Sequence, residues 1–255
     1  LKLRDEFHKN GSFDDSNKKL DEIIKLLTIS FYESKMGTDR FSIQYLEKYA
    51  EENFGDESRI SQALKDLFES VITDPMFKNS DGSNIFGDNA TLSIKPTEDE
   101  FATKLVLELC KIDFNRIIKN DNIDDFDVIN EAFGHFVRDN FRNNKEDAQY
   151  MTPKEIVDAI VNMIIADIIH DEAMLNSLLY DDEFYIMDPT CGVGTLMIEV
   201  LRGLIHHLEN SLLEEDVKKK VIHKLRTSSL IGQDKVDRMV MFSKINSMFM
   251  GCDFN

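Results

Sequence analysis

Two short segments of the chain carry residue types that could hold a charged small molecule. The first, residues 188–195 with the sequence DPTCGVGT, follows a short apolar run and precedes a helical pattern. Its glycines, Gly192 and Gly194, would let the backbone turn sharply and approach a ligand closely. Asp188 would offer a carboxylate to an ammonium group, and the free N–H groups at the start of the helix would suit a carboxylate. A zwitterionic amino-acid group needs both partners.

The second segment is Gly232-Gln233-Asp234, at the end of the next predicted strand. An acidic residue in that place can accept hydrogen bonds from both hydroxyls of a ribose, as it does in dinucleotide sites. An amino-acid site beside a ribose site indicates S-adenosylmethionine as the ligand.

Two other interpretations of these segments stay open. Tight structural turns also use two glycines after a strand, and Asp234 alone fits an ordinary surface carboxylate. The nicotinamide cofactor of an NAD-dependent oxidoreductase would need a third glycine where Met197 stands, and an acidic residue roughly 20 residues farther on. Asp234 lies about twice that far along the chain, which disfavours this interpretation.

The pattern of residues 146–255 predicts the order helix, strand, helix, strand, helix. Strands in this order run parallel with helices crossing between them, so we expect an α/β fold with the first part of a Rossmann-like sheet. Ligands of such sheets bind at the carboxyl ends of the strands, where both segments fall. The predicted elements are strands at Phe184–Met187 and Ser229–Ile231, a helix capped by Thr152 with Pro153 at its first position, and helices at Thr195 to about Leu212 and Val236–Met250.

Residues 1–145 predict an all-helical N-terminal domain, since no stretch alternates long enough to be a strand. A loop rich in Asp, Gly, Asn and Ser is expected over residues 74–95. The predicted helices are capped by Ser16, by Ser58 (ending before Pro75) and by Thr97 with Glu100 as a capping box, and a fourth lies near Val128–Phe141.

Composition limits the possible cellular locations and ligands of the protein. No run approaches the ~18 apolar residues of a membrane span, and no signal peptide is visible, so we expect a cytoplasmic protein without membrane contact. The three cysteines form no CxxC pair, and His206, His207 and His223 form no ligand set, so no metal site is predicted. The net charge of −18 disfavours a phosphate-binding face, so other chains or segments would have to grip any DNA.

The two segments and one upstream motif resemble a known family. Residues 188–194 resemble the first motif of N6-adenine DNA methyltransferases, usually written DPxCGxG, and residues 149–153 (QYMTP) resemble the motif that precedes it. Their order behind a helical region resembles the modification (M) subunit of type I restriction–modification systems, and also type IIG enzymes and phage-defence methylases. The resemblance implies a site-specific adenine-N6 methyltransferase with S-adenosylmethionine as cofactor, DNA as substrate, and specificity (S) and restriction subunits as partners.

The resemblance also implies a role for each matching residue. The methionine end of the cofactor would be lined by Tyr150, Thr152 and Pro153, and Asp188 would face its amino group. The remaining implied positions are Gly192 and Gly194 as the floor, Thr190 and Cys191 beside them, and Asp234 at the ribose hydroxyls.

The family's catalytic motif, an Asn or Asp followed by Pro-Pro and an aromatic, is absent. It would accept hydrogen bonds from the exocyclic amine of a flipped adenine and stack on the base. The four prolines are Pro75, Pro96, Pro153 and Pro189, and no two are adjacent. We therefore assign no catalytic residue and expect a fragment of a longer enzyme that does not methylate DNA alone. The alternative is a degenerate methyltransferase-like module for assembly or regulation.

Overall fold

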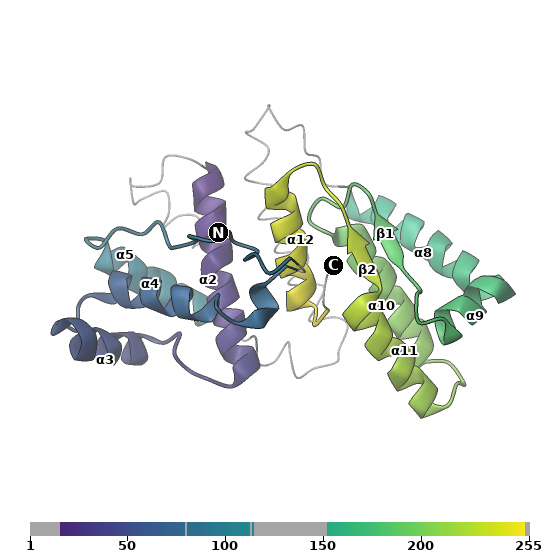
Figure 1. Ribbon diagram of the computed structural model, residues 1–255, viewed down its shortest axis with the longest axis horizontal. Coiled ribbons are helices and arrows are strands. Elements are labelled where there is room, and N and C mark those ends of the chain that lie inside the picture. Colours follow the sequence, from purple (N-terminus) through teal and green to yellow (C-terminus); the bar gives the residue numbers. More distant parts are fainter. Residues whose placement is uncertain (1–15, 80, 113, 115–151, 253–255) are drawn as a thin grey trace. The chain divides into compact units, whose positions relative to one another are not determined.

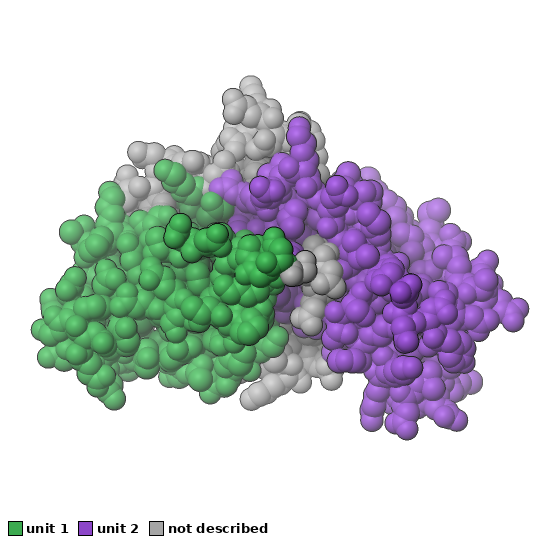
Figure 2. Space-filling view, viewed as in Figure 1, with its two compact units in different colours: residues 1–122 green, residues 123–255 purple. Residues whose placement is uncertain are grey.

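The computed structural model describes residues 16–79, 81–112, 114 and 152–252. The chain divides into two compact units, residues 1–122 and residues 123–255 (Figure 1, Figure 2). The boundary predicted at residue 145 and the helix predicted near residues 128–141 lie outside the described residues and stay predictions. None of the described helices combines the length and apolar character that crossing a lipid bilayer requires.

Unit 1 is helical throughout its described elements. Leucines and isoleucines at helical spacing turn inward, and Leu20, Ile24 and Leu64 are fully buried. Two edge-to-face aromatic pairs complete this core, Phe31 with Phe114 at 5.8 Å and Phe68 with Phe86 at 5.5 Å between ring centroids. The elements are α2 (Ser16–Met36), α3 (Ile43–Phe54), α4 (Ile60–Val71), the 3₁₀ turn η1 (Pro75–Phe77) and α5 (Asp99–Leu109).

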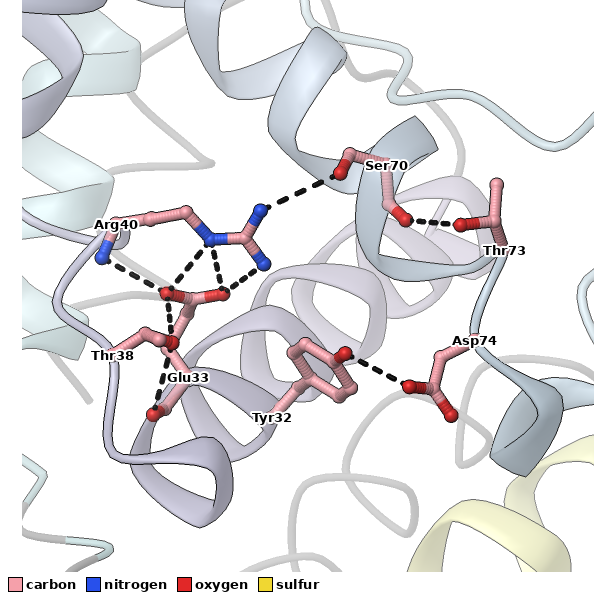
Figure 3. Close-up of polar contacts among 7 residues, drawn as sticks. All are labelled: Tyr32, Glu33, Thr38, Arg40, Ser70, Thr73 and Asp74. Carbon is pink, nitrogen blue, oxygen red and sulfur yellow. Dashed lines mark hydrogen bonds and ion pairs between the residues drawn. The ribbon is translucent and has the colours of Figure 1, made fainter.

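A buried carboxylate fixes the turn between α2 and α3 (Figure 3). Glu33 accepts hydrogen bonds from the guanidinium of Arg40 at 2.8 Å, from the backbone N–H of Arg40 at 2.9 Å and from the hydroxyl of Thr38 at 2.7 Å. Arg40 also reaches the Ser70 hydroxyl on α4 at 3.5 Å. A buried charge needs such a set of partners, so this network ties α2 and α4 to the chain that joins α2 to α3.

A second buried carboxylate joins α2 to a distant loop. Glu22 is fully buried, and its Oε1 accepts hydrogen bonds from the backbone N–H groups of Ser93 at 2.7 Å and Ile94 at 3.0 Å. Burial raises the pKa of Glu22, while the two backbone hydrogen bonds and Lys25 act in the opposite direction. The loop after η1 is therefore held to α2 by the two hydrogen bonds to Glu22.

Two predicted helix caps in unit 1 are wrong. Ser58 donates its hydroxyl to Asp56, and α4 begins instead after Arg59, without a side-chain cap. Thr97 and Glu100 form no capping box, because α5 begins after Glu98, whose carboxylate accepts from the backbone N–H of Lys95 at 2.8 Å. The sequence reasoning also overlooked α3, which Ser42 caps. The end of α4 at Val71, before Pro75, is confirmed.

Unit 2 combines helices with two parallel strands. Its described elements are α8 (Lys154–His170), α9 (Glu172–Tyr180), β1 (Ile186–Asp188), α10 (Thr195–Glu209), α11 (Glu215–Ser228), β2 (Leu230–Gly232) and α12 (Asp237–Phe249). In Figure 1, β1 and β2 lie side by side, and their register pairs Met187 with Ile231 and Asp188 with Gly232. The predicted parallel pairing is confirmed, with each strand shifted toward its carboxyl end, while a full Rossmann-like sheet stays a prediction.

The core of unit 2 is built around α10, which contacts α8, α11 and β1. Gly203 lets α8 approach closely, because a Cβ added there would lie 2.0 Å from Cδ1 of Ile165. The predicted apolar face of α8 is only partly buried, since Val157 and Val161 turn inward while Ile156 stays 50% exposed. Apolar side chains at helical spacing on this helix therefore do not all face the core.

The start of α8 and two further helices also differ from the prediction. Thr152 is not the cap of α8, because Pro153 occupies that position and no side chain caps the helix. The sequence reasoning overlooked α9 and α11. Lys224 on α11 donates to the backbone carbonyls of Leu178 at 2.7 Å and Asp181 at 2.6 Å, which closes the end of α9.

Candidate functional site

The glycine segment forms the connection between β1 and α10. β1 ends at Asp188 and α10 begins at Thr195, so the segment lies at the carboxyl end of a parallel strand, as predicted. Residues 188–194 are called the glycine loop below. Gly192 (φ 54°) and Gly194 (φ 83°) both adopt the left-handed conformation that favours glycine, and Gly194 is the N-cap of α10. These two glycines therefore create the turn from strand to helix.

Asp188 faces the loop that it starts. Its Oδ1 accepts from the backbone N–H of Thr190 at 2.9 Å and from the Thr190 hydroxyl at 3.3 Å. The backbone continues the pairing of the strands, because Gln233 N–H donates to the Asp188 carbonyl and Cys191 N–H donates to the Gln233 carbonyl, each at 2.9 Å. The glycine loop is thereby fastened to the segment that follows β2.

Asp234 reaches the same loop from the segment that follows β2. Its Oδ2 accepts a hydrogen bond from the backbone N–H of Gly192 at 3.0 Å, and its Oδ1 accepts from the N–H of Val236 at 2.9 Å. The structure thus brings Asp188 and Asp234 together on one loop, although they are far apart in sequence. Both side chains remain partly exposed to solvent.

Cys191 lies on the buried side of the loop. Burial is the largest cause that raises the pKa of its thiol to about 11, and the neighbouring carboxylates of Asp234 and Asp188 also raise this pKa. The nearby Ser243 lowers the pKa, although its hydroxyl does not meet hydrogen-bond geometry. A thiol of such a high pKa is protonated at neutral pH, so Cys191 is a packing residue there and no nucleophile.

The two glycines face different surroundings. Among the described residues, no atom lies within 4 Å of a Cβ added to Gly192, so they leave this side of the loop open. A Cβ added to Gly194 would lie 2.4 Å from Oγ of Ser243 on α12, so this side is packed. Thr190 is exposed, and no side chain of the described part of the chain caps the start of α10. The loop therefore presents an open face beside an uncapped helix start.

Two buried polar residues of α12 also contact the loop, and the sequence reasoning missed both. Asn246 donates its amide to the Val193 carbonyl at 3.0 Å, and Ser243 packs against Gly194. The one signal that could have found them was the presence of polar residues on a helix whose apolar residues Phe242, Ile245 and Phe249 mark it as core.

The upstream motif is described only in part. Thr152 and Pro153 are exposed and directly precede α8, which packs on α10. Among the described residues, neither forms a hydrogen bond to the glycine loop. Tyr150 and Met151 lie outside the described residues, so the role predicted for Tyr150 stays a prediction.

Metal ligands do not gather at this loop. Within residues 16–79, 81–112, 114 and 152–252, no three His, Cys, Asp or Glu side chains lie close enough to hold a metal ion. The histidines of α10 and α11, His206, His207 and His223, lie at least partly in solvent.

Comparison with known proteins assigns the family of unit 2. No curated protein matches the chain. Residues 124–255, just over half of the chain, match the family described as N-6 DNA methylase. This segment coincides with unit 2 to within one residue and contains the glycine loop, Asp234 and α12. The chain therefore belongs to the N-6 DNA methylase family, a family of methyltransferases that act on DNA.

Proposed function

We propose that unit 2 binds S-adenosylmethionine at the glycine loop and belongs to a site-specific enzyme that methylates N6 of adenine in DNA. The observation that carries this proposal is the junction of two carboxylates on one strand-to-helix loop. Asp188 bonds to Thr190 and Asp234 bonds to Gly192, while no described residue occupies the space that a Gly192 side chain would fill. Family membership supports the class of reaction.

The residues of the loop fit an amino-acid group joined to a ribose. The open face at Gly192 leaves the space that a side chain would fill. Asp188 would bind the ammonium group, and the uncapped start of α10 would favour the carboxylate. Each Asp234 oxygen accepts one backbone N–H, and a carboxylate has about four lone-pair sites, so capacity remains for ribose hydroxyls. Gly192 and Gly194 would form the floor, with Thr190 and Cys191 beside them, and Tyr150, Thr152 and Pro153 would line the methionine end.

The bound cofactor would supply an electrophilic methyl group. The residues of this chain would bind and orient it, and the sequence contains no Asn- or Asp-Pro-Pro-aromatic motif to hold a flipped adenine. We therefore propose that a further polypeptide segment supplies the residues that bind adenine for methyl transfer. The net charge of −18 likewise supports a DNA grip supplied by other segments or by specificity and restriction subunits of a restriction–modification system.

Ligand titration tests this proposal. The purified 255-residue chain is titrated with S-adenosylmethionine, S-adenosylhomocysteine and NAD, using calorimetry and ligand-observed NMR. We expect weak binding of both sulfur nucleosides at a common site, because the assigned residues reach only the amino-acid and ribose groups, and we expect no binding of NAD. A folded chain that ignores both sulfur nucleosides at millimolar concentration contradicts the proposal.

One alternative rests on the missing catalytic motif and the strong acidity of the chain. A degenerate methyltransferase-like module would keep the loop as a structural turn and would serve assembly or regulation. Such a module binds neither S-adenosylmethionine nor S-adenosylhomocysteine, so the same titration separates the two functions.

A further inference from the structure

The inner part of α12 is unusual because polar side chains are buried among its apolar ones. Ser243, Asn246 and Ser247 are each 0% exposed, on the helix that also buries Phe242 and Phe249. A buried polar side chain costs free energy unless it has a partner, so each one calls for an explanation. The amide nitrogen of Asn246 has its partner in the glycine loop, and Ser243 packs against the same loop.

Asn246 holds the middle of the loop. Its amide nitrogen donates to the carbonyl of Val193, the residue between the two glycines, at 3.0 Å. The N–H on the other side of the same peptide group, that of Gly194, donates to the Cys191 carbonyl at 2.8 Å. Both polar groups of the Val193–Gly194 peptide are thus bonded, which fixes the orientation of its plane directly before α10.

The neighbouring Cys191–Gly192 peptide is fixed in the same manner. Its carbonyl is the acceptor for Gly194 N–H, and its N–H donates to the carboxylate of Asp234 at 3.0 Å. Two peptide planes of the loop are therefore each held by one side chain from a distant part of unit 2. Asp234 supplies one of these side chains from the end of β2, and Asn246 supplies the other from α12.

Ser243 supports the loop by packing against Gly194, so the size of its side chain matters. Its hydroxyl oxygen would lie 2.4 Å, and its Cβ 3.4 Å, from a Cβ added to Gly194. The backbone of the loop thus rests directly on α12 at this point. A larger side chain at position 243 would push the loop toward its open face.

We propose that Asn246 and Ser243 are positioning residues that set the conformation of the glycine loop from beneath, so that its open face is formed before a ligand arrives. The identity of the ligand, S-adenosylmethionine, rests on the proposed function, whereas the positioning of the loop does not. Pre-forming a loop reduces the entropy lost on binding, and this is how two residues outside the open face would raise affinity.

The first experiment measures loop order without any ligand. In the full chain, we expect iodoacetamide to label Cys191 only when the loop opens, and labelling of Cys252, which is also buried, to report general unfolding of unit 2. We expect Asn246→Leu, which keeps the branched shape and the number of heavy atoms but removes the amide donor, to speed labelling of Cys191 at least fivefold relative to Cys252. Ser247→Ala, a change at a buried residue of the same helix, is the matched control and leaves the rate unchanged.

The second experiment measures affinity for S-adenosylmethionine by calorimetry. We expect at least tenfold weaker binding for Asn246→Leu and for Ser243→Val, partial recovery for Asn246→Gln, which retains an amide donor, and wild-type affinity for Ser247→Ala. Circular dichroism checks folding, and Ser243→Val tests the inference independently if Asn246→Leu does not fold.

The outcomes of the two experiments are separable. An unchanged ratio of Cys191 to Cys252 labelling in Asn246→Leu, or wild-type affinity in both Asn246→Leu and Ser243→Val, overturns the inference. Absence of S-adenosylmethionine binding by the wild-type chain overturns the proposed function instead, and the labelling result then still decides whether Asn246 positions the loop.

Discussion

The carboxylate of Asp234 accepts a hydrogen bond from the backbone N–H of Gly192, with 3.0 Å between oxygen and nitrogen. This bond joins the end of β2 to the loop that follows β1. The remaining lone pairs of the carboxylate are available to a ligand, so one side chain would both shape the loop and contact what the loop holds.

Replacing Asp234 should therefore weaken cofactor binding more than an ordinary surface change would. We expect Asp234→Ala to lower S-adenosylmethionine affinity by roughly tenfold or more, since a hydrogen bond to a charged group contributes about 1.5–3 kcal/mol. Asp216→Ala, a change at an exposed carboxylate on α11, is the control. Equal affinities of the two variants in calorimetry would refute a role for Asp234.

The two glycines of the loop should respond differently to alanine. Gly192→Ala meets open space at a left-handed φ of 54°, so the strain is about 1 kcal/mol and the chain should fold, while the new methyl group obstructs the open face. Gly194→Ala combines a φ of 83° with an approach of 2.4 Å to Ser243, so it should lower the stability of unit 2.

Thermal unfolding and calorimetry distinguish these effects. For Gly192→Ala we expect loss of S-adenosylmethionine binding with a nearly unchanged unfolding midpoint, and for Gly194→Ala a clearly lower midpoint. Adding Ser243→Ala to Gly194→Ala should recover part of that midpoint. The description of an open and a packed side is mistaken if the two single variants behave alike.

Glu22 makes the stability of unit 1 depend on pH. Burial raises its pKa above the usual value of 4.5, so its contribution to stability is fully present below pH 4.5 and is lost as pH rises through the folded pKa. Glu22→Gln keeps an acceptor for the N–H groups of Ser93 and Ile94. It removes the loss of stability at higher pH, because an amide does not ionise. Each unit of pKa shift corresponds to about 1.4 kcal/mol.

Chemical denaturation at several pH values checks this expectation. The free energy of unfolding of Glu22→Gln relative to wild type should increase from pH 4.5 toward pH 7. Glu47→Gln, at an exposed position on α3, should show no such trend. A constant difference for Glu22→Gln across this range would contradict the assignment.

The ammonium group of Lys224 closes the carboxyl end of α9. It donates to the carbonyls of Leu178 and Asp181, and burial lowers its pKa. We expect Lys224→Met to destabilise the end of α9 by about 1–2 kcal/mol. Hydrogen exchange in peptides of residues 172–181 should accelerate relative to Lys219→Met, which changes an exposed residue of the same helix. Equal exchange in the two variants would count against the cap.

The thiol of Cys191 should resist alkylation at ordinary pH. With a pKa of about 11, roughly one molecule in a thousand carries the thiolate at pH 8, and burial hinders access further. We expect iodoacetamide to label the exposed Cys110 first, and the rate at Cys191 to rise with pH until the thiol titrates. Mass spectrometry of the labelled peptides measures both rates, and rapid labelling of Cys191 at pH 8 would contradict this environment.

The sequence alone determined the local backbone structure of the site. Glycines, an acidic residue and a helix start at residues 188–195 specify a strand-to-helix turn because each step depends on backbone preferences of neighbouring residues. The parallel pairing of two short apolar strands followed from the helical crossover predicted between them, although that crossover contains α11 as well as α10. Helix caps at Thr152, Ser58 and Thr97 were mistaken because each helix begins one residue later than predicted, after Pro153, Arg59 and Glu98, and none of these caps its helix with a side chain.

Only the tertiary structure decided which polar residues are buried and which backbone groups they bond, both at the glycine loop and in unit 1. Asn246 and Val193 are 53 positions apart, and Glu22 and Ser93 are 71 positions apart, so no local pattern links them. Helical periodicity marks Asn246 and Glu22 merely as polar interruptions of an apolar helix. These side chains stabilise the fold only after packing has removed water and left one backbone group within hydrogen-bond distance. A buried polar group without a partner costs free energy, whereas a paired one holds the backbone in one conformation.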